Sequence, residues 1–370
     1  MTKKNRTKKQ HYIAQCLLKT FFESDKIICK NVKDCKVYQS SIDDSMCKNN
    51  SYEFVLFEDN WLEDIFANNV DGKSNEIIKE TIKKLNNNMV IDAVDIIKNN
   101  IGLLLINYFK SLTSLIHMSS NMDKPGQDSI ARLVDRIANE SYINRIGTLL
   151  NTEYKIAFIK SNTGKFILSD QYISTCAIKF NSRLVNVSNR NIGMKDTLVL
   201  IPLNKYYYVA FVAGELPYEY SINYNSINIL SDDYVFKINE IIYNNSYEKV
   251  ASFNIDTVSI LKKNNSSFGD SLITVGFNSG NNMTYKVKQE VFFTKEEYEM
   301  YEYYCSNDWA KKEYIKCKVN QKCPCGSNLK YKKCCKNKVD RCLHVFYTIH
   351  HKKESLILNN ELGFEEDILI

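Results

Sequence analysis

Four cysteines near the end of the sequence have a spacing that suits a metal ion. They are Cys323, Cys325, Cys334 and Cys335, in the pattern Cys-x-Cys-x8-Cys-Cys. Four thiolates can surround one Zn²⁺ as a tetrahedron, and an ion held by four protein ligands has no open position for an activated water. The spacing therefore predicts one structural zinc ion. A redox cysteine cluster and an iron–sulfur site are the alternatives.

The remaining cysteines are weaker candidates for metal ligands. Close to the cluster, Cys317, Cys342 and His344 are possible substitutes for one of the four ligands. Four more cysteines occur in the first fifty residues, but their gaps match no common ligand spacing. We expect those four to be small buried hydrophobic side chains. They are Cys16, Cys29, Cys35 and Cys47.

Positive charge is concentrated around the cysteine cluster. Residues 311–341 hold eleven Lys or Arg against Glu313 and Asp340, a formal charge of +9 in a chain whose total is +6. Residues 1–10 carry a further five positive charges and no acidic residue. Such patches favour polyanionic partners, so we expect an acidic protein, a nucleic acid or the ribosome to bind here. The lysines expected to contact it are Lys330, Lys332, Lys333 and Lys336.

The stretch CPCGSNLKYKKCC at 323–335 resembles the SEC-C motif. This motif is the zinc module at the C-terminus of the SecA translocation ATPase and of many unrelated bacterial proteins. Asn328 and Leu329 replace the Gly and Lys of its commonest form, and Cys335 replaces the His of SecA as the last ligand. The resemblance implies zinc and a surface that docks a protein or the ribosome. It does not imply translocation, because the chain has no GxxxxGK[ST] phosphate loop.

The elements that position this cluster are predicted from periodicity and turn residues. Residues 26–39 suit a hairpin, 60–150 are mainly helical, and 154–213 contain four apolar β-branched or aromatic runs. We expect Asn162-Thr163-Gly164 to join 154–160 and 164–170 as a hairpin, and a helix near 232–252. A capping box at Thr294 predicts a further helix that leads to the cysteines.

These elements together predict an α+β protein, in which a helical and β-sheet body precedes a small C-terminal four-cysteine zinc module. The expected divisions are a body of unknown activity, a linker or irregular strands, a helix with the zinc module, and an acidic and apolar tail. In residue numbers they are 1–260, 261–293, 294–345 and 346–370.

Composition favours a globular protein in a reducing compartment. Hydrophobic residues make up 44% of the sequence, which suffices for a sizeable core. No apolar segment with a cleavage site follows the charged start, and the most apolar stretch, 90–109, contains too many polar residues to cross a bilayer. Clustered cysteines in such a chain indicate metal binding instead of disulfides. We therefore expect a cytoplasmic protein without a membrane span, and the sequence leaves its oligomeric state open.

The body also resembles a known family. KKQHYIAQCLLKTF near the start is similar to the opening of bacterial proteins with domain of unknown function 4238. The positions that match are His11, Tyr12, Ile13, Gln15, Leu18 and Phe21, followed later by Ser169 and Asp170. Later segments extend the resemblance to roughly 8–255. The family has no established activity to transfer to this chain.

Catalytic candidates in the body are few. His11 and Asp170 would form a general base and its orienting carboxylate if the fold brought them together. Glu153 and Lys155, with Asp135 upstream, match half of a metal-dependent nuclease motif. The simpler interpretation is that His11 caps a turn and Asp170 caps the element after its strand. Chance would then account for the Glu-x-Lys match in a chain rich in both residues.

The sequence therefore favours a zinc-stabilised binding or adaptor protein, whose basic C-terminal module docks a protein, nucleic-acid or ribosome partner. The alternative is a hydrolase or nuclease in the body, belonging to a defence or mobile-element locus, with the zinc module as its tether. Whether the protein is an enzyme stays open, because no catalytic motif rises above chance.

Overall fold

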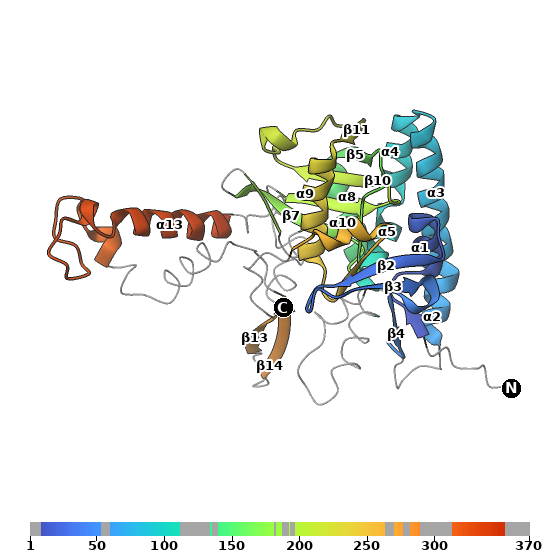
Figure 1. The fold of residues 1–370 in the computed structure, drawn as a ribbon, viewed down its shortest axis with the longest axis horizontal. Coiled ribbons are helices and arrows are strands. Elements are labelled where there is room, and N and C mark those ends of the chain that lie inside the picture. The colour runs from blue at the N-terminus through green and yellow to red at the C-terminus, as the bar shows by residue number, and fades with distance from the viewer. Residues whose placement is uncertain are drawn as a thin grey trace.

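The computed structural model of the chain describes most of the body and the cysteine-rich segment. The described residues are 9–52, 60–111, 134, 140–180, 183–186, 192, 197–262, 270–276, 282–288 and 313–351. Within them the structure is α+β, as the sequence predicts (Figure 1). No helix in the described part of the chain is long and apolar enough to cross a membrane.

A six-stranded sheet forms the centre of the body, in the order β11-β5-β10-β9-β7-β8. All neighbours are antiparallel except β11 and β5. Every residue of β9 and β10 is buried, which explains why their sequences are continuous apolar runs without alternation. The strands are β5 (Lys155–Ser161), β7 (Ser174–Phe180), β8 (Arg183–Asn186), β9 (Thr197–Pro202), β10 (Tyr207–Ala213) and β11 (Ile227–Leu230).

A second sheet has four strands in the order β3-β2-β12-β6. The predicted hairpin at 26–39 is confirmed, because β2 and β3 pair as antiparallel neighbours. A separate two-stranded ladder joins β1 to β4 near the N-terminus. The strands of these two sheets are β1 (Lys9–His11), β2 (Lys26–Asn31), β3 (Val37–Ser41), β4 (Cys47–Asn49), β6 (Leu168–Ser169) and β12 (Lys249–Ser252).

The predicted hairpin between 154–160 and 164–170 is wrong. The first segment forms β5, which pairs with β10 on one side and β11 on the other. Both edges of β5 are therefore occupied, and the chain leaves this sheet after the turn at Gly164, whose φ is +65°. The next strand that the chain forms is β6, which pairs with β12 in the second sheet.

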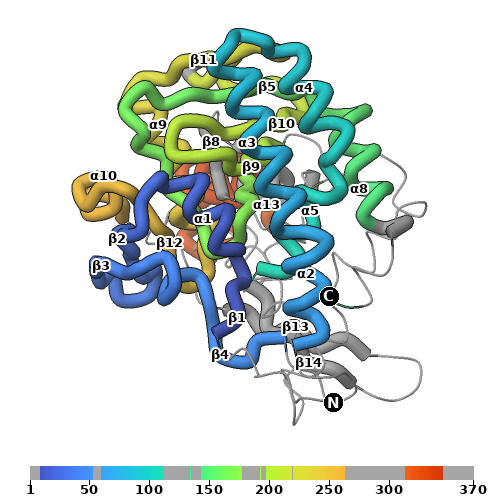
Figure 2. Tube along the Cα trace, turned by 90° about the vertical axis from the view of Figure 1, so that its right-hand side faces the viewer, coloured from blue at the N-terminus to red at the C-terminus, as the bar shows by residue number. Residues whose placement is uncertain are grey.

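Helices pack along the body and connect its two sheets. In both views α3 and α4 lie side by side (Figures 1 and 2). The buried positions of α3 recur every three or four residues, which is the helical period expected for one apolar face. The helices of this part are α1 (Gln15–Phe22), α2 (Trp61–Phe66), α3 (Gly72–Asn86), α4 (Val90–Asn99), α5 (Ile101–Phe109) and α8 (Glu140–Glu153).

Helix α9 (Asp232–Asn245) contacts strands of both large sheets. Its first turn is capped by the Ser231 hydroxyl, which accepts a hydrogen bond of 3.3 Å from the amide of Tyr234. The helix is shorter than the predicted 232–252, because the chain becomes extended again and forms β12. After β12, the short helix α10 (Ile255–Ser259) contacts β2 and β3 of the second sheet.

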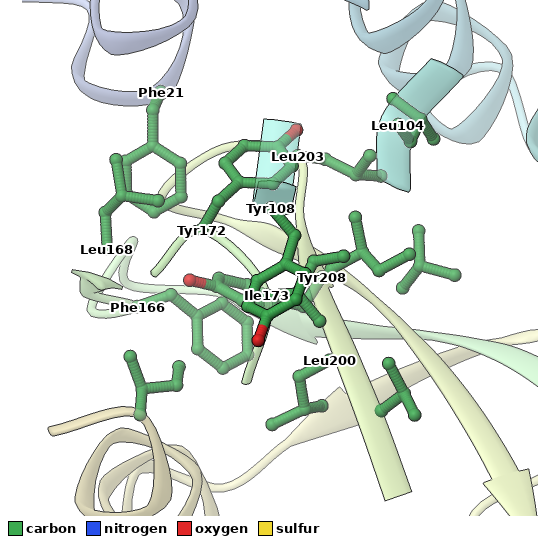
Figure 3. Close-up of a cluster of buried hydrophobic side chains, with 14 of the residues drawn as sticks. Phe21, Leu104, Tyr108, Phe166, Leu168, Tyr172, Ile173, Leu200, Leu203 and Tyr208 are labelled. Atoms are coloured by element: carbon green, nitrogen blue, oxygen red, sulfur yellow. The ribbon is translucent and has the colours of Figure 1, made fainter. Parts of the chain in front are cut away.

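One hydrophobic core includes buried side chains from Tyr12 to Leu261. Figure 3 shows part of it, where the rings of Phe166 and Tyr208 lie 5.0 Å apart between their centroids. The buried hydroxyl of Tyr208 donates a hydrogen bond of 2.5 Å to the carbonyl of Ile167, so its polar atom is satisfied. Helices and both large sheets thus share a single core.

Beyond the body, β13 (Asp270–Gly276) and β14 (Asn282–Lys288) form an antiparallel hairpin in the segment expected to be a linker or irregular strands. Of the helix predicted from Thr294 towards the cysteines, residues 294–312 lie outside the described residues, and 313–316 are helical. Helix α13 (Lys336–His351) follows the cysteines directly and continues past residue 345, where the tail was expected to begin. The division of the chain into a body and a separate module stays a prediction.

Candidate metal centre

A short antiparallel turn places the first two cysteines beside the last two. Lys322 and Lys330 form an isolated β-bridge. On either side of it, the amide of Cys323 donates to the carbonyl of Leu329 at 2.8 Å, and the amide of Tyr331 donates to the carbonyl of Gln321 at 2.8 Å. The eight residues between Cys325 and Cys334 therefore fold back onto the first pair.

Local backbone conformation completes this turn. Gly326 has a φ of +81°, a region that is open to glycine at no steric cost, and its amide donates to the carbonyl of Cys323 at 3.2 Å. Asn328 has a φ of +59°, which asparagine tolerates better than most residues. A 3₁₀ turn at Tyr331–Lys333 then leads to Cys334 and Cys335, and α13 begins at the next residue.

The four predicted ligands come together. The sulfur atoms of Cys323, Cys325, Cys334 and Cys335 all lie within 4.8 Å of one another. The Sγ atoms of Cys325 and Cys334 are 3.5 Å apart, and those of Cys334 and Cys335 are 3.7 Å apart. A tetrahedral site with Zn–S bonds of ~2.3 Å separates its sulfur atoms by ~3.8 Å. The donor set and its spacing therefore fit a metal ion of this kind.

Electrostatics around the sulfurs differ from one thiol to the next. The Ser327 hydroxyl, with help from neighbouring amide and thiol groups, lowers the pKa of the exposed Cys325 thiol to about 6. Burial, together with the adjacent thiols, raises the pKa of Cys335 to about 12. Four sulfurs this close cannot all be anionic without a cation between them, so a bound dication is what makes a four-thiolate set favourable.

A small core supports the cluster. Buried Tyr314, Tyr331 and Val339 pack with Cys323, and the two tyrosine rings lie 6.0 Å apart between centroids. This core is separate from that of the body. Among the described residues this core is small, and a metal ion bound by the four sulfurs would add to its stability.

The nearby alternative ligands are not part of the four-sulfur group. The thiol of Cys317 donates to the carbonyls of Lys318 and Lys322, at 3.6 and 3.7 Å. Cys342 is buried in α13, and His344 is exposed on the same helix. Among the described residues, the group that could hold a metal consists of the four predicted cysteines.

Comparison with known families agrees with this geometry. Residues 320–337 match the family model of the SEC-C motif. In this chain, the residues that match the SEC-C motif thus include the four cysteines of the sulfur cluster. A second family model, Protein of unknown function (DUF4238), matches residues 9–106. Both resemblances noted in the sequence are confirmed over these ranges, whereas the extension of the second to residue 255 stays a prediction.

Comparisons with individual proteins add nothing to these two family matches. No curated protein matches the chain, and no solved structure does so either.

The structure gives Asp170 a structural setting. Its carboxylate is fully buried and accepts hydrogen bonds from three consecutive backbone amides after α9: Tyr247 at 2.9 Å, Glu248 at 2.5 Å and Lys249 at 2.9 Å. These bonds fix the bend that starts β12. The carboxylate therefore caps the start of β12 beside its neighbour β6, whereas the simpler sequence interpretation had it cap the element that follows its own strand.

His11 lies elsewhere, at the end of β1. Its Nε2 atom is 3.4 Å from the carbonyl of Ile42 and 3.5 Å from the side-chain nitrogen of Gln15. The charges that act on its pKa belong to Lys110, Asp43 and Asp71, so no pairing with Asp170 is among its main interactions. The structure therefore does not assemble the predicted base and carboxylate as neighbours.

The structure gives the other candidate pair, Glu153 and Lys155, different surroundings. Glu153 ends α8 and is exposed. Lys155 begins β5, and its ammonium lies 4.9 Å from the centre of the Tyr224 ring, a cation–π arrangement. Asp135, the third member of the nuclease half-motif, lies outside the described residues. The described part of this constellation shows no shared metal site.

A buried ion pair in the body escaped the sequence analysis. The ammonium of Lys110, whose side chain is 1% exposed, pairs with Asp71 at the end of a π-helical turn, Ala67–Asp71. It also lies 5.0 Å from the centre of the Phe66 ring. The only sequence indication was a lysine directly after the apolar run IGLLLINYF, which does not reveal its distant partner.

Burial of His11 predicts a pH-dependent stability. Burial lowers the pKa of His11, with Lys110 contributing in the same direction, while the unfolded chain has a pKa of ~6.5. As pH falls from 7.5 to 5.5, the unfolded state gains the proton first. The free energy of unfolding should therefore fall, by at most ~1.4 kcal/mol per pH unit for this group.

The measurement is the denaturant midpoint of the body at pH 7.5, 6.5 and 5.5. His11→Gln should show a shallower fall than the unchanged protein. His344→Gln, at an exposed position of α13, is the control and should keep the full slope. Equal slopes in all three proteins would mean that His11 titrates alike in the folded and unfolded states.

Proposed function

We propose that this protein is a zinc-stabilised adaptor whose SEC-C motif docks an acidic protein segment. The observation that supports it best is the group of four sulfur atoms within 4.8 Å of one another. Sulfur-only coordination favours Zn²⁺ among the common cellular cations, and four protein ligands close the site against water. The ion would therefore hold the docking surface in shape and take no part in a reaction.

Metal analysis tests the first half of this proposal. Protein purified without chelators should contain one zinc ion per chain by mass spectrometry of the metal content. Iron with inorganic sulfide in equal amounts would instead identify an iron–sulfur site, and a preparation with neither metal would contradict metal stabilisation of the SEC-C motif.

The turn that carries the SEC-C motif, with the residues just before it, has exposed apolar and basic side chains close to one another in the chain. Val319 and Leu329 are 45% and 53% exposed. The carbonyl of Val319 accepts a hydrogen bond of 3.0 Å from the amide of Lys332, so the two residues face each other across the turn. We call this surface the docking face. It consists of the exposed residues Val319, Leu329, Lys330, Lys332 and Lys333, which the hydrogen bonds of the turn hold together.

Three of the four lysines predicted to contact a partner remain available on this face. Within the described residues no carboxylate pairs with Lys330, Lys332 or Lys333, all of which are exposed. The fourth, Lys336, pairs with Asp340 one turn along α13. Exposed cations next to exposed apolar side chains suit a partner that carries both carboxylates and hydrophobic residues.

The same surface is less suited to nucleic acid. Single strands bind through aromatic side chains that stack on the bases, but both tyrosines described in the module, Tyr314 and Tyr331, are buried. Binding to phosphates alone would leave Val319 and Leu329 without a role. We therefore favour an acidic protein segment over RNA or DNA.

A binding assay separates these partners. The probes are a synthetic peptide of alternating Glu and Leu residues and a 20-nucleotide single strand, each labelled with a fluorophore. The peptide should bind the full chain more tightly, and it should retain measurable affinity at 0.5 M salt because part of its contact is apolar. A nucleic-acid partner would bind more tightly than the peptide and lose affinity steeply with salt.

Paired variants locate the binding surface. Changing both Lys332 and Lys333 to Gln should weaken peptide binding by about 2- to 30-fold, since each exposed ion pair contributes ~0.2–1 kcal/mol. The control changes Lys73 and Lys79, exposed lysines of α3, to Gln. Equal effects of the two pairs would place binding elsewhere or make it nonspecific.

A further inference from the structure

The end of the chain carries a segment whose chemistry complements the docking face. Residues 354–370, ESLILNNELGFEEDILI, contain five carboxylates, no Lys or Arg and eight large apolar side chains. The docking face offers exposed Val319 and Leu329 together with three lysines that pair with no carboxylate among the described residues. We infer that the acidic segment 354–370 docks on this face of the same chain and competes with an external acidic partner.

This inference rests on the proposed docking function and adds its regulation. We choose a segment of this chain as the occupant because the length of chain that follows α13 is sufficient to reach the docking face. Helix α13 starts directly after Cys335 and ends at His351, a rise of ~24 Å for its sixteen residues. The seventeen residues of the acidic segment can span ~55 Å when extended, which is more than enough to return along α13 to the cysteines.

Covalent connection gives the segment an advantage over an external partner. A short flexible tether holds its ligand at an effective concentration in the millimolar range. Even a weak contact, with a dissociation constant of ~0.1 mM, would then occupy the face about nine-tenths of the time. An external partner must displace the acidic segment from the docking face. The apparent affinity of that partner therefore falls about 10-fold, the ratio of the effective concentration to the dissociation constant.

The first test measures peptide binding after the acidic segment is neutralised in the full chain. With the Glu–Leu peptide as probe, the neutralised variant should bind about 10-fold more tightly than the unchanged protein. The variant carries Glu361→Gln, Glu365→Gln, Glu366→Gln and Asp367→Asn. A matched control removes four exposed carboxylates of the body and should leave the affinity unchanged; it carries Glu76→Gln, Glu80→Gln, Asp95→Asn and Glu153→Gln.

The outcomes distinguish a failure of this inference from a failure of the docking proposal. The comparison requires equal zinc content in the unchanged protein, the neutralised variant and the matched control. If neither the neutralised nor the unchanged protein binds the peptide, the docking function fails. If both bind it equally well, docking stands and self-occupancy is overturned. An equal gain in the matched control would show a general charge effect and would also overturn it.

The second test maps the contact directly. A zero-length carbodiimide reagent joins a lysine amine to a carboxylate that touches it, and an equal mixture of ¹⁴N- and ¹⁵N-labelled protein distinguishes links within one chain from links between two. Links between Lys330, Lys332 or Lys333 and the carboxylates at 361–367 are expected, with a single isotope label. Cross-links that join a ¹⁴N chain to a ¹⁵N chain would show that the segment docks on a second copy, and would overturn docking within one chain. Absence of these links, while other links form, would overturn the contact.

Discussion

Cys334→Ser is expected to release the metal and unfold the SEC-C motif while the body stays folded. Cys334 belongs to the four-sulfur cluster, and its Sγ lies 3.5 Å from that of Cys325 and 3.7 Å from that of Cys335. Serine does not replace a thiolate as a zinc ligand, so affinity should fall at least ~100-fold. We expect the small core around Tyr314 and Tyr331 to be lost with the ion.

Two measurements check this result together. Metal content should drop below one-tenth of the unchanged protein, and amide hydrogen exchange should rise throughout 313–351 but not in the strands β9 and β10. Cys317→Ser is the matched control, because that thiol packs beside the cluster without belonging to it. Unfolding of the whole chain in Cys334→Ser would show that the body depends on the module and would contradict the predicted division at residue 260.

Asp170→Ala should destabilise the body by about 4 kcal/mol. The substitution removes one buried carboxylate and leaves three neighbouring backbone amides, at Tyr247, Glu248 and Lys249, without their acceptor. Hydrogen bonds to a charged group are worth ~1.5–3 kcal/mol each, and unsatisfied buried donors add to the loss. Cooperative repacking and water entry recover part of it, which gives the smaller net figure.

Guanidinium unfolding, followed by circular dichroism, measures the change. Asp170→Asn retains one acceptor oxygen and should lose less than half as much stability. Asp25→Ala, at an exposed position just before β2, should shift the unfolding free energy by no more than ~0.5 kcal/mol. A midpoint unchanged in Asp170→Ala would reject the capping role and return this carboxylate to the list of catalytic candidates.

The metal ligands could be predicted because their geometry is local. The four ligands lie within thirteen consecutive residues, from Cys323 to Cys335, and a turn with Gly326 in it leaves few ways to arrange four thiols. Continuous apolar runs likewise located β9 and β10, since strands buried on both faces require apolar residues at every position. The surrounding lysines were also evident from composition alone.

Long-range pairing could not be predicted in the same way. The segments that form β5 and β6 looked like the two arms of a hairpin, but they belong to different sheets because β10 and β11 occupy both edges of β5. The role of Asp170 depends on amides nearly eighty residues later in the sequence. No local pattern contains that information.

The sequence by itself thus determined the chemistry of the cysteine cluster, the sign of the charge around it and the α+β class. Only the tertiary structure decided which polar groups are buried and with which partners, as for Lys110 with Asp71 and for the lysines that stay unpaired on the docking face. The physical reason is that ligand spacing and apolar periodicity are properties of neighbouring residues. Burial and pairing, in contrast, are set by contacts that form when distant segments pack into one core.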